Sequence, residues 1–187
     1  MEKSDIPLEN ENDVVTFSDV NIDSWFYNAV SFVVERNLFS GVNEKEFAPT
    51  ETMTHAMIWV VLANYMGEII EQSGETWYSN AQAWAMAQGI TEGEKPNVEL
   101  TREELIQSLY LLEGSPETKE QDFSGFVDGE AISLWATQSM AWAVNQGLLK
   151  GDNLGKHNPK DQCNRAEVAA ILMNYIINIE TNSSIGT

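Results

Sequence analysis

One spacing recurs three times in this chain and limits the folds that it can adopt. In each of three windows a tryptophan is followed sixteen residues later by a glycine. The pairs are Trp25 with Gly41, Trp77 with Gly93, and Trp135 with Gly151. Such recurrence is typical of repeat proteins, in which no copy can bury its apolar face alone. The 187 residues are therefore expected to contain three related units.

Each window begins with the pattern of a short helix. An aromatic residue stands seven positions after the tryptophan, and a leucine or isoleucine stands thirteen after it. Just before the latter lies a residue type that ends helices in the left-handed conformation. These residues are Asn37, Gly89 and Gly147. The first helix of each unit is predicted over about residues 25–36, 77–88 and 135–146.

A second helix follows a loop in each unit. Counting from His55, Arg102 and Arg165, the residues three, seven and ten positions on are all apolar or aromatic, at the spacing of one buried helical face. They are Ile58, Leu62 and Tyr65, then Leu105, Leu109 and Leu112, then Val168, Leu172 and Tyr175. These helices are predicted over about residues 54–66, 101–113 and 164–177.

The starts of the second helices carry capping patterns. Thr101 precedes Glu104 by three residues, and Asn164 precedes Glu167 by three, which is the capping box or a close variant of it. In the first unit Thr54 is followed by a methionine in place of the glutamate, so that cap is only half made. We interpret these residues as structural.

The fold class follows from the helices. Phenylalanine and aspartate open the first unit at Phe17 and Asp19 and the third at Phe126 and Asp128, whereas the second offers only Ile69 and Glu71. A helix pair of about fifty residues cannot bury its apolar stripe alone, but three pairs that share a centre can. We therefore predict one all-α domain of three helix-loop-helix repeats. The repeats are 14–67, 68–114 and 126–180, with a linker at 115–125 and flexible tails at 1–13 and 181–187.

Composition excludes several function classes. The formal net charge of -19 argues against a surface that binds nucleic acid or anionic lipid. The single Cys163 and the isolated His55 and His157 form no spaced metal motif, so we expect no metal, no cofactor and no special role for His157 or Cys163. No apolar run is long enough to span a membrane. The polar N-terminal segment is no secretory signal, so the chain is either cytoplasmic or part of a longer exported protein.

Two arginines stand where a helix disfavours them. Arg102 and Arg165 fall in the first turn of a second helix, where a cation costs roughly 0.3–1 kcal/mol. One hypothesis is that each binds an anion together with free backbone N–H groups of the helix N-terminus. The other is that each pairs with an acidic neighbour of its own chain such as Asp128, Glu71 or Glu103. Both remain open at this point.

The ordered set of motifs resembles the S-layer homology domain over about residues 14–180. The resemblance rests on "FSDV", the tryptophan and glycine pairs, "FAP", and the helix openings "LTREE" and "CNRAE". It implies a pseudo-threefold, spindle-shaped bundle at the bacterial cell surface. Grooves between its repeats would bind secondary cell wall polymer, typically through a terminal sugar with a pyruvate ketal. The motif arginine would meet the ketal carboxylate, and no covalent chemistry would occur.

This sequence departs from that pattern in places. His55 stands where the arginine belongs and cannot make its planar fork, so that site is expected to be weak or altered. The loop from Gly93 to Arg102 is five residues shorter than its counterparts. We therefore expect at most two competent grooves, those of Arg102 and Arg165, and expect the fold to survive replacement of either arginine by alanine.

Other groups have two interpretations each. Trp25, Trp77 and Trp135 either pack at helix starts or stack on sugar rings. Gly41, Gly93 and Gly151 are turn glycines that could also let a ligand approach the backbone. The main hypothesis is a monomeric, noncatalytic wall anchor. The alternative is a diverged module for protein interaction or S-layer assembly, and no motif favours an enzyme.

Overall fold

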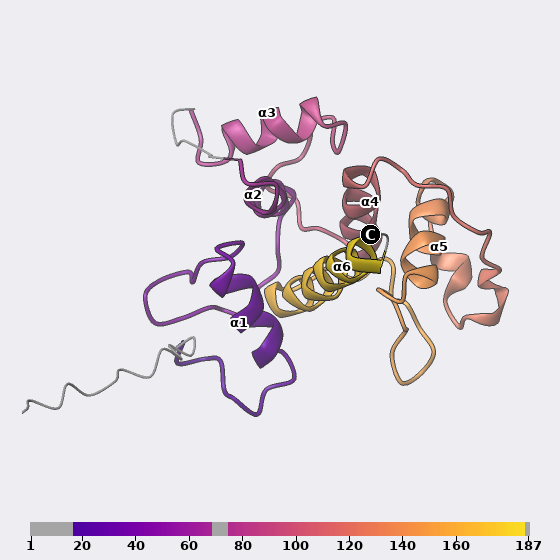
Figure 1. The fold of residues 1–187 in the computed structure, drawn as a ribbon, viewed down its shortest axis with the longest axis horizontal. Coiled ribbons are helices and arrows are strands. Elements are labelled where there is room, and N and C mark those ends of the chain that lie inside the picture. The colour runs from indigo at the N-terminus through magenta and orange to yellow at the C-terminus, as the bar shows by residue number, and fades with distance from the viewer. Residues whose placement is uncertain (1–16, 69–74, 186–187) are drawn as a thin grey trace, which may run out of the picture.

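The computed structural model describes residues 17–68 and 75–185, and its regular structure is helical (Figure 1). Within those residues the extended backbone makes three isolated bridges and no sheet, which confirms the predicted all-α class. The α-helices are α1 (Tyr27–Glu35), α2 (His55–Tyr65), α3 (Ser79–Ala87), α4 (Arg102–Leu112), α5 (Thr137–Asn145) and α6 (Arg165–Ile185). Short 3-10 turns are η1 (Phe123–Gly125), η2 (Gly129–Ala131) and η3 (Leu134–Ala136).

Helix boundaries differ from the prediction at two kinds of position. Trp25 and Trp77 precede α1 and α3 by two residues, and Trp135 lies in η3, which leads into α5. The tryptophans therefore stand before the first helices instead of opening them. Helix α6 continues to Ile185, past its expected end. The helix-ending residues are as predicted, with φ of 56° at Asn37, 72° at Gly89 and 70° at Gly147.

A closed ring of backbone hydrogen bonds joins the three units. The N–H of Met53 donates to Cys163 at 2.9 Å, that of Cys163 to Leu100 at 2.9 Å, and that of Leu100 back to Met53 at 2.8 Å. Each of these residues stands two positions before a second helix. Burial raises the pKa of the Cys163 thiol to about 12, so the thiol stays protonated at neutral pH. The pseudo-threefold arrangement stays a prediction, and this ring supports it.

Helix packing follows the same cyclic order. Helix α3 packs on α2, α5 on α4, and α1 on α6 (Figure 1). Each first helix therefore packs on the second helix of the preceding unit, and the first unit packs on the last. Consecutive helices of one unit are not principal partners in the described part of the chain. The units interlock and do not fold as separate helix pairs.

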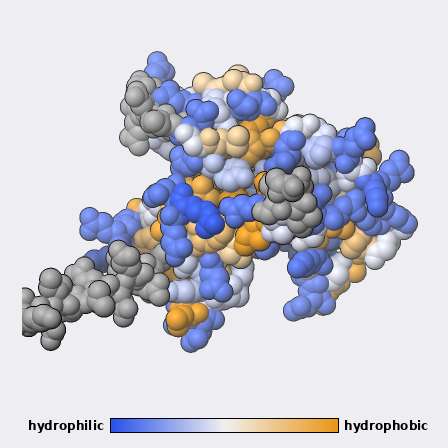
Figure 2. Space-filling view, in the orientation of Figure 1, coloured by the Kyte–Doolittle hydropathy of each residue, from blue (hydrophilic) through white to orange (hydrophobic). Residues whose placement is uncertain are grey.

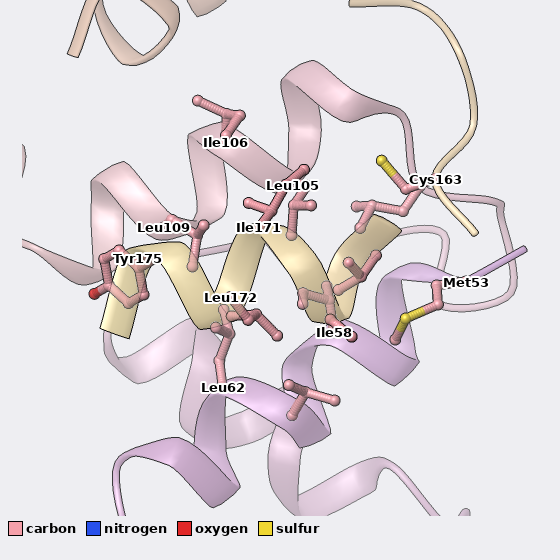
Figure 3. Close-up of a cluster of buried hydrophobic side chains, with 14 of the residues drawn as sticks. Met53, Ile58, Leu62, Leu105, Ile106, Leu109, Cys163, Ile171, Leu172 and Tyr175 are labelled. Carbon is pink, nitrogen blue, oxygen red and sulfur yellow. The ribbon is translucent and has the colours of Figure 1, made fainter. Parts of the chain in front are cut away.

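The core lies where the three second helices meet (Figure 3). The predicted face is buried at seven of its nine positions, and the other two, Tyr65 and Leu112, are half-buried against the same cluster. Figure 3 shows side chains of α2, α4 and α6 pointing toward one another, with Met53 and Cys163 at one end. Apolar burial at this junction is the main driving force for bringing the units together.

The surface matches the composition. Figure 2 shows hydrophilic residues over most of the visible face and hydrophobic residues in smaller patches. Among the described residues, no helix has both the length and the apolar character needed to cross a bilayer.

Candidate ligand-binding grooves

Three cavities lie where units meet, and each takes its motif residue from one unit and its loop from another. The Arg165 groove, of about 250 Å³, joins Arg165 to α2 and to the loop after α1. The His55 groove, of about 120 Å³, joins His55 to α4 and to the loop after α3. The Arg102 groove, of about 220 Å³, joins Arg102 to α6 and to the loop after α5. Two larger cavities beside the 115–121 segment and Tyr175 contain none of the predicted site residues.

The tryptophans are distributed unevenly among these grooves. Trp77 lines the Arg165 groove and is 48% exposed, and Trp135 lines the His55 groove and is 53% exposed. Trp25 is 68% exposed and is not among the lining residues of the Arg102 groove. Partly exposed indole rings thus border two of the three grooves.

The three glycines differ in role. A side chain on Gly41 would come within 2.4 Å of the Asn43 carbonyl oxygen, so this turn has no room for one. Gly93 and Gly151 have φ of 81° and 74°, which a glycine adopts without strain. Only Gly151 of the three lines a groove in the described structure.

The second helices do not offer free N–H groups at their N-termini, so that expectation is wrong. Their first two backbone N–H groups donate to carbonyl oxygens in the loop of another unit. The pairs are His55 with Val98 and Ala56 with Pro96, Arg102 with Asp161 and Glu103 with Pro159, and Arg165 with Glu51 and Ala166 with Pro49. The caps supply further partners, because Glu167 N–H donates to Asn164 Oδ1 and Met57 N–H to Thr54 Oγ1. The first N–H groups of these helices are therefore not available to an anion.

Both capping boxes form as predicted. The backbone N–H of Thr101 donates to Glu104 Oε2 at 2.8 Å. That of Asn164 donates to Glu167 Oε2 at 3.0 Å. In the first unit only the Thr54 half is present, as expected.

Arg165 is buried and tied to backbone. Only 8% of the residue is exposed. Its Nε donates to the Phe47 carbonyl and its Nη2 to the Ser40 carbonyl, each at 2.7 Å. The guanidinium carbon lies 4.5 Å from the centre of the Phe47 ring, which adds a cation–π contact. Burial lowers the pKa of Arg165. No ion pair of Arg165 is found within the described residues, so neither Asp128 nor Glu103 is its partner, and Glu71 lies outside those residues.

Arg102 pairs with Glu167, an acid that the sequence analysis assigned only to a helix cap. Its Nη2 donates to Glu167 Oε1 at 3.0 Å, and the two side chains are 16% and 27% exposed. Of the expected partners, Asp128 accepts backbone bonds elsewhere, Glu103 pairs with Lys160, and Glu71 lies outside the described residues. The Nε of Arg102 is buried without a hydrogen-bond partner in the described structure.

His55 faces a carboxylate. Its Nε2 lies 3.5 Å from Glu104 Oε2, and Glu104 also caps its own helix. Burial opposes ionisation of Glu104, but hydrogen bonds from Thr101 and the nearby His55 outweigh it and lower the pKa of Glu104. This groove therefore has a histidine beside a carboxylate, whereas in the next unit the guanidinium of Arg102 lies beside Glu167.

His157, for which no special role was expected, lines the Arg102 groove. It is 3% exposed, its ring centre lies 4.3 Å from that of Phe126, and neither ring nitrogen has a hydrogen-bond partner in the described structure. Burial lowers the pKa of His157, and the Arg102 charge acts in the same direction. Buried polar atoms normally have partners, so the two unpaired nitrogens make this ring an unsatisfied group of the Arg102 groove. Sequence carries no signal for it, because a lone histidine is usually structural.

Comparisons with known proteins agree with these features. The family model described as S-layer homology domain matches residues 16–56 and 125–169, which fall in the first and third units. The chain is 30% identical to "Exoglucanase XynX" of Acetivibrio thermocellus, over 84% of this chain and 16% of that protein. It is 27% identical to "Surface-layer 125 kDa protein" of Lysinibacillus sphaericus, over 96% of this chain and 11% of that protein.

A third relative also matches most of this chain but over only a small part of its own length. "Amylopullulanase" of Thermoanaerobacterium thermosulfurigenes is 29% identical over 84% of this chain and 9% of that protein. The chain thus spans less than a fifth of each of these three relatives. S-layer homology domains are noncatalytic modules that anchor S-layer and other surface proteins to the cell wall. The matched family regions and the helical fold together establish that the chain belongs to the S-layer homology family and to the cell surface.

Proposed function

We propose that the chain is a noncatalytic anchor whose grooves bind secondary cell wall polymer through a pyruvylated terminal sugar. The observation that carries the proposal is the shared construction of the grooves. Each lies between units and combines a motif residue, a loop and, in two cases, an exposed tryptophan. A clamped carboxylate and a stacked sugar ring need that combination of groups.

The net charge makes the arginines informative. In a chain of charge -19, an acidic ligand is repelled at long range and must be held by local cations. Arg102 meets this need, because its partner Glu167 is partly exposed and such pairs contribute little. A ligand carboxylate can therefore compete with Glu167 for the guanidinium. His55 beside Glu104 cannot act in that way, which supports a weak or altered site there.

The test is calorimetry of the chain against purified wall polymer, with and without its pyruvate ketal. We expect the ketal to be required and Arg102→Ala to weaken binding by about 2 kcal/mol or more, since the bound ligand covers the guanidinium. Glu68→Ala, on the exposed segment after α2, is the matched surface control and should bind as the unaltered chain does. Equal binding of the ketal-free polymer would overturn the proposed specificity.

A protein-interaction or assembly role is the second candidate. Ile22 and Trp25 are 71% and 68% exposed, and neither lines a groove. Exposed large apolar residues can serve as contacts with another protein. Trp25→Ser would reduce self-association in analytical ultracentrifugation under this hypothesis and would leave polymer binding unchanged. A purely monomeric chain at all concentrations would argue against it.

A further inference from the structure

The loops of the first and third units differ in charge at corresponding positions. Residues of these loops correspond at the separation of Trp25 from Trp135, and their hydrogen bonds agree with that register. Asp19 accepts from the backbone N–H groups of Phe47 and Ala48, as Asp128 does from those of His157 and Asn158. Ser40, Glu46 and Phe47 of the first unit thus correspond to Lys150, Lys156 and His157 of the third.

This difference concentrates cations in one groove. Arg102, Lys150 and Lys156 all line the Arg102 groove, with Asp152 as the carboxylate among the lining residues. The backbone N–H groups of Leu154 and Lys156 donate to Asp152 Oδ1, and Asn158 donates to Oδ2. Asp152 is therefore engaged in shaping its own loop. In a chain with ten Lys and Arg, three around one cavity is a local excess.

The other two grooves lack this charge. In the Arg165 groove the guanidinium already satisfies the Phe47 and Ser40 carbonyls, and no lysine lines the cavity. In the His55 groove no lysine or arginine lines the cavity, and the Glu104 carboxylate is among the lining groups. Neither cavity has a lysine, or an arginine that does not already donate to backbone carbonyl oxygens.

The Arg102 groove also contains buried polar atoms that have no hydrogen-bond partner in the described structure. Both ring nitrogens of His157 and the Nε of Arg102 are buried and unpaired in the described structure. A neutral imidazole offers one donor and one acceptor, which suits a hydroxyl or amide group, whereas the cations suit an anion. A sugar that carries an acidic substituent presents both kinds of group together.

We propose that the Arg102 groove is the one anion-binding groove of this chain. Lys150 and Lys156 hold the acidic substituent of a sugar together with Arg102, and His157 hydrogen-bonds a neighbouring hydroxyl or amide. This rests on the proposed function and sharpens it, because it limits binding to one acidic sugar per chain and makes Arg165 a structural residue. The acidic group is a carboxylate of the ketal or a phosphate of the polymer backbone.

The decisive variant gives the third loop the residues of the first. Lys150→Ser with Lys156→Glu and His157→Phe should weaken binding of the pyruvylated polymer by tenfold or more. Lys45→Ser with Lys119→Glu makes the same change of net charge at exposed residues outside the three grooves, and should leave affinity unchanged. Circular dichroism of each variant shows whether the fold is retained, and His157→Gln alone keeps the test open if the triple variant unfolds.

Two histidines make a second measurement possible. His55 and His157 are the two histidines of the chain and line different grooves. In NMR titrations with sodium pyruvate and with inorganic phosphate, the His157 ring signals should shift and saturate while those of His55 do not. The probe that binds more tightly distinguishes a carboxylate source from a phosphate source.

The outcomes separate the two proposals. If the unaltered chain binds polymer and the triple variant binds it equally well, the single-groove inference is overturned while the anchoring function stands. If the unaltered chain does not bind polymer but His157 responds to either small anion, the anchoring function fails and the anion site stands. Without binding or a His157 shift, both fail. A stoichiometry of two acidic sugars per chain also overturns the inference.

Discussion

At the residue scale, Arg165 is a structural cation. Its alanine variant would leave the Phe47 and Ser40 carbonyls without their donor and a space beside two phenylalanine rings. Because each unsatisfied buried group costs about 1–3 kcal/mol, we expect Arg165→Ala to lower the free energy of unfolding by roughly 2–5 kcal/mol in urea denaturation. This revises the expectation that the fold survives the change. Arg102→Ala, with a partly exposed ion pair, should cost less than about 1.5 kcal/mol.

His157 gives the fold a dependence on pH. Its pKa in the folded chain lies below the ordinary value of 6.5, because burial disfavours the charged ring. Below that pH the unfolded chain binds the proton more readily, so the stability due to this histidine is complete above about pH 6.5 and declines as pH falls toward the folded pKa. The Asp128, Arg102 and Asp152 charges around the ring modify the extent of this decline.

The matching prediction uses the residue of the first unit. His157→Phe should flatten the decline in the free energy of unfolding as pH falls below about 6.5, because phenylalanine has no proton to gain. Glu104, whose lowered pKa removes stability at lower pH, should still cause a fall below about pH 4.5 in both proteins. Equal slopes for the two proteins between about pH 6.5 and about pH 4.5 would show that His157 is not the group responsible.

At the element scale, one glutamate contacts the N-terminal ends of two helices, α6 and α4. Glu167 accepts from the Asn164 backbone with one oxygen and from Arg102 with the other. Glu167→Gln can keep the cap through its amide oxygen while it removes the charge that competes for Arg102. We expect anion affinity to rise about two- to fivefold, as the loss of a partly exposed ion pair allows, measured by calorimetry. Glu104→Gln in the other box is the control and should not change it.

The helices were the most predictable part of the molecule. Three apolar or aromatic residues at helical spacing located each of the three second helices, and capping boxes marked the starts of two of them. Both signals depend on nearby residues alone. The tryptophans misled at the first helices, since their large side chains mark the start of a unit without being helical. The end of α6 was missed, because the sequence contains no glycine or proline between Ile177 and Ile185, and the first such residue is Gly186.

The site was only partly predictable. The arginines were visible because they contradict a local rule at helix N-termini. Their partners were not, because the Phe47 carbonyl and Glu167 come from other units and no spacing in the sequence reports such contacts. The same limit hid the bonded N–H groups and the unpaired ring of His157.

At the scale of the whole molecule, the cyclic packing predicts strong dependence between units. The fragment 1–114 contains α1 and α4 without their partners α6 and α5. We therefore expect fragments 1–114 and 115–187 to be largely unfolded alone and to regain helix when mixed, as measured by circular dichroism. A cooperative thermal transition of 1–114 alone would contradict this.

The ring through Met53, Leu100 and Cys163 also bears on how such a module can evolve. Open arrays of repeats gain or lose copies at an end, because each copy contacts only its neighbours. Here the last copy bonds back to the first, so an added fourth copy would find no vacant backbone partner. Variation is confined to changing the chemistry of individual clefts, so a single chain can keep one cleft for adhesion while the others drift.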